Sequence, residues 1–505
     1  MNWIALKMLT GDKPKFFGIV MGLTFAALLI TQQGSIFCGL MCRTAGQVTD
    51  ITGADLWVMD PNVRFVDDVK PMIENNLYRV RSVPGVKWAV PLYKGNGRVK
   101  LTPEIRELEK IEPEDSQGRE LPPVYRRKID EYGNPARAKV IEQVILLGLD
   151  DATLVGAPPP ERIEAGRVED LRKPDAVMID YTRLRKLFPG EEWSLEETHR
   201  KTASELTPEQ RTRFELAYGR IPTDPDGKVN FYSLFLAREL EMNDHRAVIV
   251  AICEATRTFQ SNPVVYTTFS RAKQFIPRER KMLSYILVKI AEEDQHPGTL
   301  LDRFIGRIGL PSWLDPKTDA LIRSESPGAF IANEIGGWGS ERRPETARVT
   351  KAILDRTGLK ARTRQEFMWD TIGYYLKYTG IPINFGITAA LGFLVGTAIA
   401  GQTFYNFTLE NLKQFGALKA MGATNLRIVG MILLQACVVG LLGYGLGVGL
   451  AAWFGLSAGK SELAFYTPWE LLPMSGFAIV LICVLASLLC IRRVVVLEPA
   501  IVFRG

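Results

Sequence analysis

The sequence predicts an α+β fold in which four membrane-spanning helices carry a large mixed α/β domain, inserted after the first helix. The first observation is that four windows of the 505-residue chain hold no charged residue. Each is long enough for the roughly 20 residues that a helix needs to cross a bilayer. The second is that the stretch between the first two windows alternates strand-like and helix-like runs, which is typical of a domain with its own core. The windows are residues 16–41, 378–409, 428–459 and 471–491.

The first window could instead be the apolar core of a cleaved signal peptide. Its 26 uncharged residues exceed the roughly 7 to 15 that are typical of such a core. No small-x-small cleavage pattern follows it, and Phe37 stands before Cys38, where a lipoprotein processing site has a small residue. We therefore expect a retained helix.

The charge of the connecting segments predicts how the helices are oriented. Segments 1–15, 403–428 and 492–505 hold nine Lys and Arg and three Asp and Glu, so their net charge, 9 minus 3, is +6 and equals that of the whole chain. Positively charged loops stay in the cytoplasm. We therefore expect both termini and the 403–428 loop in the cytoplasm, and the long stretch from about 43 to 376 outside.

The stretch GLSAGKSE, residues 455–462, looks like the phosphate-binding loop of an ATPase. Such a loop needs four residues between its first glycine and Gly-Lys-Ser/Thr. Gly455 and Gly459 have three residues between them, Phe454 stands where the glycine should, and the chain holds no other stretch with the required spacing. We expect a chain that is not an enzyme, has no ATPase site of its own and binds no cofactor.

The residues that usually carry metal, redox or ion-transport chemistry are few. Most of the six cysteines fall inside the windows, and the three histidines are isolated, so neither a disulfide framework nor a metal site is expected. The windows also lack the ionisable groups that ion channels and proton-coupled carriers usually need at depth. No catalytic motif occurs in the inserted domain, and no nucleic-acid partner is expected.

The inserted domain shows strand patterns, two charge-rich interruptions and a helical approach to the second span. The charge-rich stretches, 103–138 and 191–245, could be solvated surface insertions or partner-specific binding arms. Helical spacing from 342 to 376 runs toward the second span, and an unbroken helix there would be a lever, bent near Pro382. Strands are expected at 54–60, 86–93, 140–149, 175–180, 246–253, 263–269 and 283–290, with helix candidates at 66–83, 271–276 and 298–309.

Two features of the membrane part predict how its helices pack and what its inner loop forms. Four-residue spacing of glycines lets helix backbones approach closely. It occurs at Gly392 and Gly396 in the second span and at Gly443 and Gly447 in the third, and Gly445 and Gly449 repeat it.

Residues 403–430 place apolar side chains at helical spacing, and Gly422 in the run MGATN can end that helix. Such an amphipathic helix could lie on lipid or dock into a partner's groove.

Within 370–456 the charged Glu410 is followed by a Gly-x-Leu-Lys-Ala-x-Gly-Ala stretch at 416–423 and by a glycine-rich span that contains Gln435. This pattern resembles the carboxy-terminal core of the FtsX-like and MacB-like permeases of ABC transporters. The run from Tyr378 to Ala423 is most similar to the DevC-like subgroup, which is associated with glycolipid or efflux export. The ending LEPAIVFRG and the start ALKMLTGDKPKFFGIVMG also suit the family. The residues that match the family pattern are Glu410, Lys413, Gly416, Leu418, Lys419, Ala420, Gly422, Ala423 and Gln435.

The resemblance implies a permease subunit of an ABC exporter in the bacterial inner membrane. A separate cytoplasmic ATPase would bind the ATP, and the subunit would pass its energy to the outer domain as movement, for efflux of a lipid or small molecule. A second permease copy, identical or related, a membrane-fusion adaptor and an outer-membrane duct are further implied partners. The residues implied to couple to the ATPase are Glu410, Asn411, Lys413, Phe415, Gly416, Leu418, Lys419 and Gly422.

Two other functions remain open at this level. Within the family, the chain could belong to a lipoprotein-releasing complex or regulate cell-wall hydrolases. From another class, it could be a membrane-anchored receptor, although the sequence offers only short basic cytoplasmic segments.

The expected organisation is a cytoplasmic segment 1–15, a span 16–42, an extracytoplasmic domain 43–376, a span 377–402, a cytoplasmic coupling loop 403–427, a span 428–456, an outer loop 457–470, a span 471–491 and a cytoplasmic tail 492–505.

Overall fold

The structure, a computed structural model, describes residues 2–111, 124–129, 135–276, 283–291, 344–458 and 463–495. It divides the chain into two compact units, which we name by their content. The helix unit is Met1–Cys42, Gly298–Ser340 and Tyr375–Gly505, and the sheet unit is Arg43–Pro297 and Glu341–Tyr374. The predicted α+β fold with four long apolar helices is confirmed. The helix candidate at 298–309 and the tail from 496 lie outside the described residues.

The sheet unit is built on ten strands in the order β12-β1-β11-β2-β5-β10-β7-β9-β6, with β8 pairing both β2 and β9. β2 joins the two halves, because its first part pairs with β11 and the rest with β5. β5 and β10 run parallel, as do β7 and β9, and the other described pairs of this sheet are antiparallel. The strands are β1 (Leu56–Met59), β2 (Val86–Leu101), β5 (Val140–Leu149), β6 (Ile163–Gly166), β7 (Ala176–Asp180), β8 (Glu239–Met242), β9 (His245–Cys253), β10 (Val264–Thr268), β11 (Tyr285–Ile290) and β12 (Lys360–Thr363).

All seven strands expected from the sequence are confirmed, and so is the short helix near 271–276, which is α6 (Phe269–Phe275). The helix expected at 66–83 is wrong over its first half, since only α3 (Asn75–Arg81) forms. The Val66 carbonyl instead accepts hydrogen bonds at 2.8 Å from Lys94 Nζ and from the Tyr285 hydroxyl. β6, β8 and β12, four residues each, and the hairpin of β3 (Leu108–Ile111) and β4 (Val124–Arg127) were not expected.

The second charge-rich stretch is not simply a solvated insertion. It folds around aromatic side chains into 3₁₀ turns and the helix α5 (Pro208–Tyr218). It also contacts the first stretch: the Leu108 N–H donates to the Glu192 carboxylate at 2.7 Å, and Arg127 Nε donates to the Leu216 carbonyl at 2.5 Å. Charged side chains therefore cover a core that the sequence pattern conceals. The buried aromatic residues are Phe214, Phe231, Tyr232 and Phe235, with Trp193 half-buried against them.

The expected unbroken lever before the second span is wrong. α10 (Pro344–Thr357) ends at Gly358, whose φ of +71° favours glycine, and β12 then pairs with β1. α11 (Arg364–Tyr378) follows, and α12 (Ile381–Glu410) begins after Gly380. Pro382 lies in the first turn of α12 and therefore bends no continuous helix.

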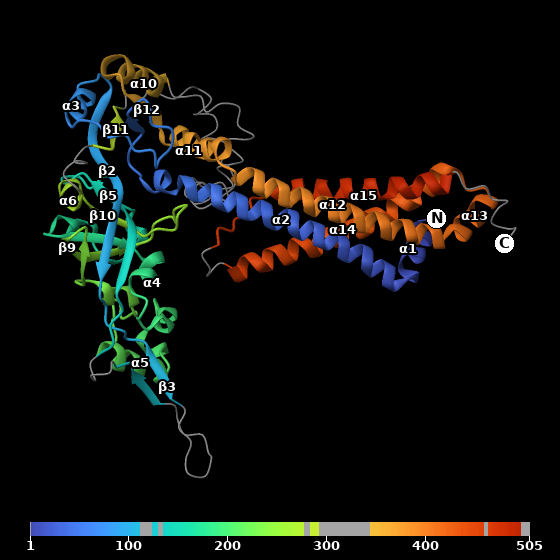
Figure 1. The fold of residues 1–505 in the computed structure, drawn as a ribbon, viewed down its shortest axis with the longest axis horizontal. Helices are drawn as coiled ribbons and strands as arrows, with labels where there is room; N and C mark the ends of the chain where they lie inside the picture. The colour runs from blue at the N-terminus through green and yellow to red at the C-terminus, as the bar shows by residue number, and fades with distance from the viewer. Residues whose placement is uncertain are drawn as a thin grey trace, which may run out of the picture. The chain divides into compact units, whose positions relative to one another are not determined.

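Among the described residues, four helices are long and apolar enough to cross a membrane, and they form the bundle of the helix unit (Figure 1). They are α2 (Lys13–Asp50), which continues into the sheet unit, α12, α14 (Asn425–Ala458) and α15 (Leu471–Val495). Two short helices, α1 (Asn2–Gly11) and α13 (Leu412–Ala420), lie at the same end of this bundle. Residues 455–458 of the GLSAGKSE stretch form the last turn of α14, and its remainder lies outside the described residues.

The spaced glycines lie where α2 comes close to α12 and α14. A Cβ on Gly443 would stand 2.6 Å from Leu23 Cβ, and one on Gly447 would stand 2.5 Å from Ala27 Cβ. A Cβ on Gly392 would lie 3.1 Å from Leu29 Cβ, and a Cβ on Gly396 would collide with Ala26 Cβ. By contrast, a Cβ on Gly445 or on Gly449 would meet nothing within 4 Å. Within this helix unit, one face of α14 therefore needs glycine and another does not.

In the sheet unit, Asp180 at the end of β7 is only 1 % exposed. Its carboxylate accepts hydrogen bonds from the Thr182 N–H at 3.0 Å, the Thr182 hydroxyl at 2.6 Å and the Ala255 N–H at 3.3 Å. Burial nevertheless raises the pKa of Asp180 from its ordinary 3.8 to about 6, because these bonds offset only part of the lost hydration. The native state thus holds a proton over a pH range in which the unfolded chain has released it.

We expect Gly447→Ala to lower stability by about 1–3 kcal/mol relative to Gly449→Ala, because the added methyl overpacks the α2 contact. Both changes bring the same gain in helix propensity, so their difference isolates the packing cost. Thermal unfolding of the two purified variants in one detergent measures it. Equal midpoints would show that α2 does not approach α14 this closely.

Because the pKa of Asp180 is raised, the contribution of this group to stability is fully present below its ordinary pKa of 3.8 and is lost as pH rises through about 6. From about pH 5 to about pH 7.5 we expect a loss of about 1–1.5 kcal/mol from this group. Asp180→Asn should abolish that part of the pH dependence. Unfolding midpoints of the native chain and the variant at both pH values provide the comparison. A native chain whose pH dependence matches that of the variant would contradict the assignment.

Candidate functional site

The residues expected to couple to an ATPase lie in a helix hairpin made by the end of α12, α13 and the start of α14. Asn411 forms the joint between α12 and α13, since its Nδ2 and backbone N–H donate to the Phe407 carbonyl at 2.8 and 3.1 Å. Gly422 has a φ of +92°, and its N–H donates to the Lys419 carbonyl at 3.0 Å. The expectation that Gly422 ends the helix is confirmed, and α14 begins three residues later.

One side of the hairpin is buried in the helix unit. Phe404, Phe407 and Phe415 are buried in one cluster with Leu9 and Ile428. Gly416 is buried beside Phe415. The apolar stripe that was expected to face lipid or a partner is therefore core over these positions. The reason is that α12 continues to Glu410, beyond the expected end of the span, so the stripe packs against α1 and α14.

The other side of the hairpin exposes apolar and basic side chains at its turn. Met421 is 75 % exposed and Leu426 is 82 % exposed, on either side of Gly422. Lys413 and Arg427 are exposed as well. Leu426 and Arg427 were not among the expected coupling residues. The signal that could have found Leu426 is its place just after the helix-ending turn, outside the stripe that continues at Ile428.

The remaining expected residues make contacts within the helix unit. Glu410 forms an ion pair with Lys15, which also contacts Asp12 at 2.5 Å. The hydrogen bond from Lys15 holds the pKa of the Asp12 carboxyl below its usual value. Lys419, half-buried like Leu418, donates from Nζ to the Val494 carbonyl at 3.4 Å, near the end of α15. A cation at the carboxyl end of a helix is favourable.

Gln435, the polar residue of the third span that matched the family pattern, holds α1 in place. Its Nε2 donates to the Ala5 carbonyl at 2.8 Å, and the side chain is buried. An amide buried in a membrane protein is stabilised when it finds such a partner. The hairpin, α1 and α14 are thus joined by specific polar contacts as well as by packing.

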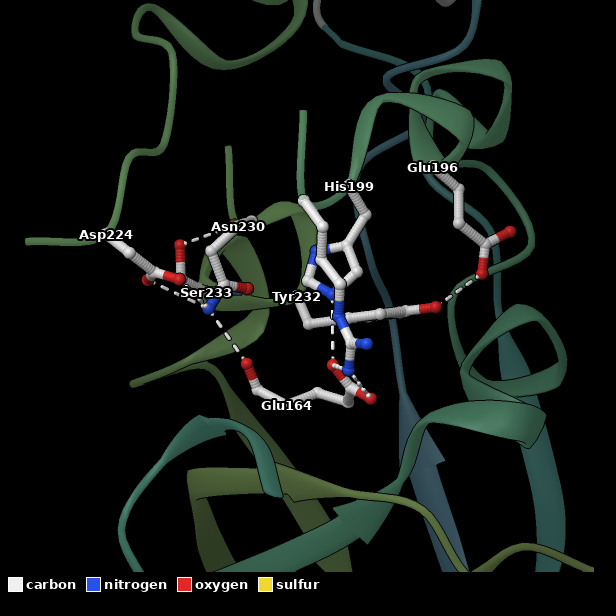
Figure 2. Close-up of polar contacts among 8 residues, drawn as sticks. Glu164, Glu196, His199, Asp224, Asn230, Tyr232 and Ser233 are labelled. Carbon is white, nitrogen blue, oxygen red and sulfur yellow. Dashed lines mark hydrogen bonds and ion pairs between the residues drawn. The ribbon is translucent and has the colours of Figure 1, made fainter. Parts of the chain in front are cut away.

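A second polar cluster lies in the sheet unit, around Glu164 of β6 (Figure 2). Its carboxylate accepts two hydrogen bonds from Arg200 at 2.8 and 2.9 Å and lies 3.0 Å from His199 Nε2. Its backbone carbonyl accepts from Asn230 Nδ2 at 2.8 Å, and the same amide contacts Asp224 at 3.0 Å. These bonds fasten the second charge-rich stretch to the sheet.

The Glu164 cluster has the geometry of an ion-pair network rather than of a nucleophilic site. Among the described contacts of His199 there is a carboxylate and the edge of the Tyr232 ring, at 4.7 Å between centroids, but no hydroxyl or thiol. A nucleophilic triad needs such a group within hydrogen-bond reach of the imidazole. The Tyr232 hydroxyl instead donates to Glu196 at 2.8 Å, and burial together with that charge raises the pKa of Tyr232.

Comparison with known proteins gives a family match for part of the helix unit. A family model described as FtsX-like permease C-terminal matches residues 386–499, which cover most of α12, α13, α14 and α15. Proteins named uncharacterized ABC transporter permease from Mycobacterium bovis and Mycobacterium tuberculosis are 32% identical over 124 residues, which is 24% of this chain and 33% of theirs. The chain thus spans about a third of the length of these curated relatives. Residues 386–499 are thus similar to an FtsX-like permease domain.

Solved structures that resemble part of the chain include two domains of other transporters. The extracellular domain of the noncanonic ABC-type transporter YknZ from Gram-positive bacteria has a TM-score of 0.23 and 10% identity, covering 57% of this chain and 95% of that one. The periplasmic region of MacB from Actinobacillus actinomycetemcomitans has a TM-score of 0.25 and 10% identity, covering 66% and 96%. Both TM-scores are low, and neither likeness bears on function.

Proposed function

We propose that this chain is the membrane-spanning subunit of an ABC exporter, which passes movement from a separate cytoplasmic ATPase to the sheet unit for efflux of a lipid or small molecule. The observation that carries the proposal is the hairpin turn. Met421 and Leu426 are exposed there, whereas Phe404, Phe407 and Phe415 of the same hairpin are buried. The match of residues 386–499 to a permease domain supports a partner of the ATPase class.

The chemistry of the turn suits a protein groove with an acidic rim. Covering exposed apolar side chains with a partner stabilises the complex, and helices commonly present such side chains to grooves. Lys413 and Arg427, exposed near these anchors, add electrostatic attraction to an acidic rim. The caps at Asn411 and Gly422 keep the turn in one conformation, so less conformational entropy is lost on docking.

The wider assembly is part of the same proposal. Both termini and the hairpin lie on the ATPase side in the bacterial inner membrane, as their positive charge favours. ATP is bound by the partner. A second permease copy, identical or related, completes the membrane part, and the export route of a DevC-like system includes a membrane-fusion adaptor and an outer-membrane duct.

We expect the double substitution Met421→Ser and Leu426→Ser to weaken ATPase binding about tenfold or more, because each removes an apolar anchor of the kind that dominates interfaces. Co-purification with the ATPase and ATPase stimulation in nanodiscs are the measurements. Ile73→Ser, at an exposed apolar side chain of the sheet unit, is the matched control and should leave both unchanged. Native binding by the double variant would remove the turn from the docking surface.

Gly422→Val should abolish stimulation of the ATPase while the unfolding midpoint of the chain changes little. A β-branched residue at a φ of +92° is strained by roughly 1–3 kcal/mol, and a changed turn relieves that strain. Gly416→Leu, at a buried position of α13, should also abolish stimulation, and its overpacked side chain should lower the unfolding midpoint as well. Gly430→Ala is the control, since a Cβ there meets nothing within 4 Å. Wild-type stimulation by the Gly422 variant would refute the coupling role.

A further inference from the structure

The helix α1 has two faces, one of which is held against the bundle. Ala5 and Leu9 are fully buried, and the Ala5 carbonyl accepts the hydrogen bond from Gln435 at 2.8 Å. Leu9 belongs to the same cluster as Phe404 and Phe415. α1 is therefore a fixed part of the helix unit rather than a loose end.

The opposite face of α1 is apolar and basic. Trp3 is 69 % exposed, Ile4 is also exposed, and Lys7 Nζ lies 4.6 Å from the centre of the Trp3 ring. Phe17 of α2, one of the apolar helices long enough to span a membrane, is exposed as well. An indole and a lysine that share one exposed face are typical of a segment at the headgroup level of a bilayer.

Length excludes a spanning role for α1 and favours the interface. Its ten residues make a helix about 15 Å long, roughly half of the hydrocarbon thickness. The chain turns at Asp12 before α2 begins at Lys13. A short helix at the end of a spanning bundle, with one face packed on protein and an apolar face exposed, is placed to lie in the interface plane.

The charges of this segment favour an anionic surface. Its one acid, Asp12, is engaged by Lys15 at 2.5 Å. Lys7 and Lys13 are exposed and have no carboxylate partner among the described residues. Two lysines beside an apolar surface attract anionic lipid headgroups.

We propose that α1 is an interfacial helix that binds anionic phospholipid headgroups through Lys7 and Lys13, with Trp3 and Ile4 inserted among the lipids. The inference requires only that the helix unit spans a bilayer and does not depend on the ATPase partner.

The test uses the full chain in nanodiscs that mix phosphatidylcholine and phosphatidylglycerol, with bromine on the acyl chains of one lipid or of the other. The emission of Trp3 is obtained as the difference between the native chain and Trp3→Phe, since the chain has nine tryptophans. We expect blue-shifted Trp3 emission that brominated phosphatidylglycerol quenches more strongly than brominated phosphatidylcholine.

The charge requirement is tested with the double substitution Lys7→Gln and Lys13→Gln. It should reduce the preference for phosphatidylglycerol about 30-fold, because each lysine near an anionic surface contributes about a factor of five. Lys87→Gln, at an exposed lysine of the sheet unit, is the control and should leave the preference unchanged.

Two outcomes would overturn the proposal. Unquenched, water-like Trp3 emission with either lipid would remove α1 from the bilayer. Equal quenching by the two lipids in the native chain would remove its preference for anionic headgroups. Because no ATPase is present, neither result bears on the coupling proposal.

Discussion

The close approach of α2 to the glycines of α12 and α14 is the contact on which the helix unit depends. Lipid tails are as apolar as the side chains of these helices, so van der Waals contact rather than the hydrophobic effect must hold them together. Such contact requires backbones that nearly touch, and a Cβ at Gly443 or Gly447 would stand within 2.6 Å of α2 atoms. The register of this packing then decides which side chains of α12 and α14 lie inside the bundle.

The hairpin derives its two-sided character from that packing. With α2, α12 and α14 in place, Phe404, Phe407 and Phe415 fill the end of the bundle together with Leu9 of α1. Met421 and Leu426 remain exposed because the turn at Gly422 carries the chain away from this core. The ion pair of Lys15 with Glu410 joins the start of α2 to the end of α12. α1 and the hairpin are therefore parts of one packed end of the helix unit.

The sheet unit shows how charge can conceal a core. The second charge-rich stretch surrounds Phe214, Phe231 and Phe235 with acidic and basic side chains that form specific contacts, such as Arg213 with Glu192 at 2.6 Å. Glu164 connects this stretch to the sheet through hydrogen bonds. It lies in β6, a short strand whose sequence shows no clear strand pattern. Many polar groups of this stretch are thus paired with groups that are distant in the sequence.

The sequence by itself determined the elements with strong local signals. These are the four long apolar helices, the seven strands rich in β-branched residues and the helix end at Gly422, each encoded in consecutive residues. Only the tertiary structure decided the elements that depend on distant partners. β12 interrupts the expected lever because β1 offers it hydrogen bonds, and four residues are too few for a pattern to reveal this. The inward face of the hairpin was decided in the same way, since helical spacing defines a stripe but cannot say whether protein, lipid or a partner covers it.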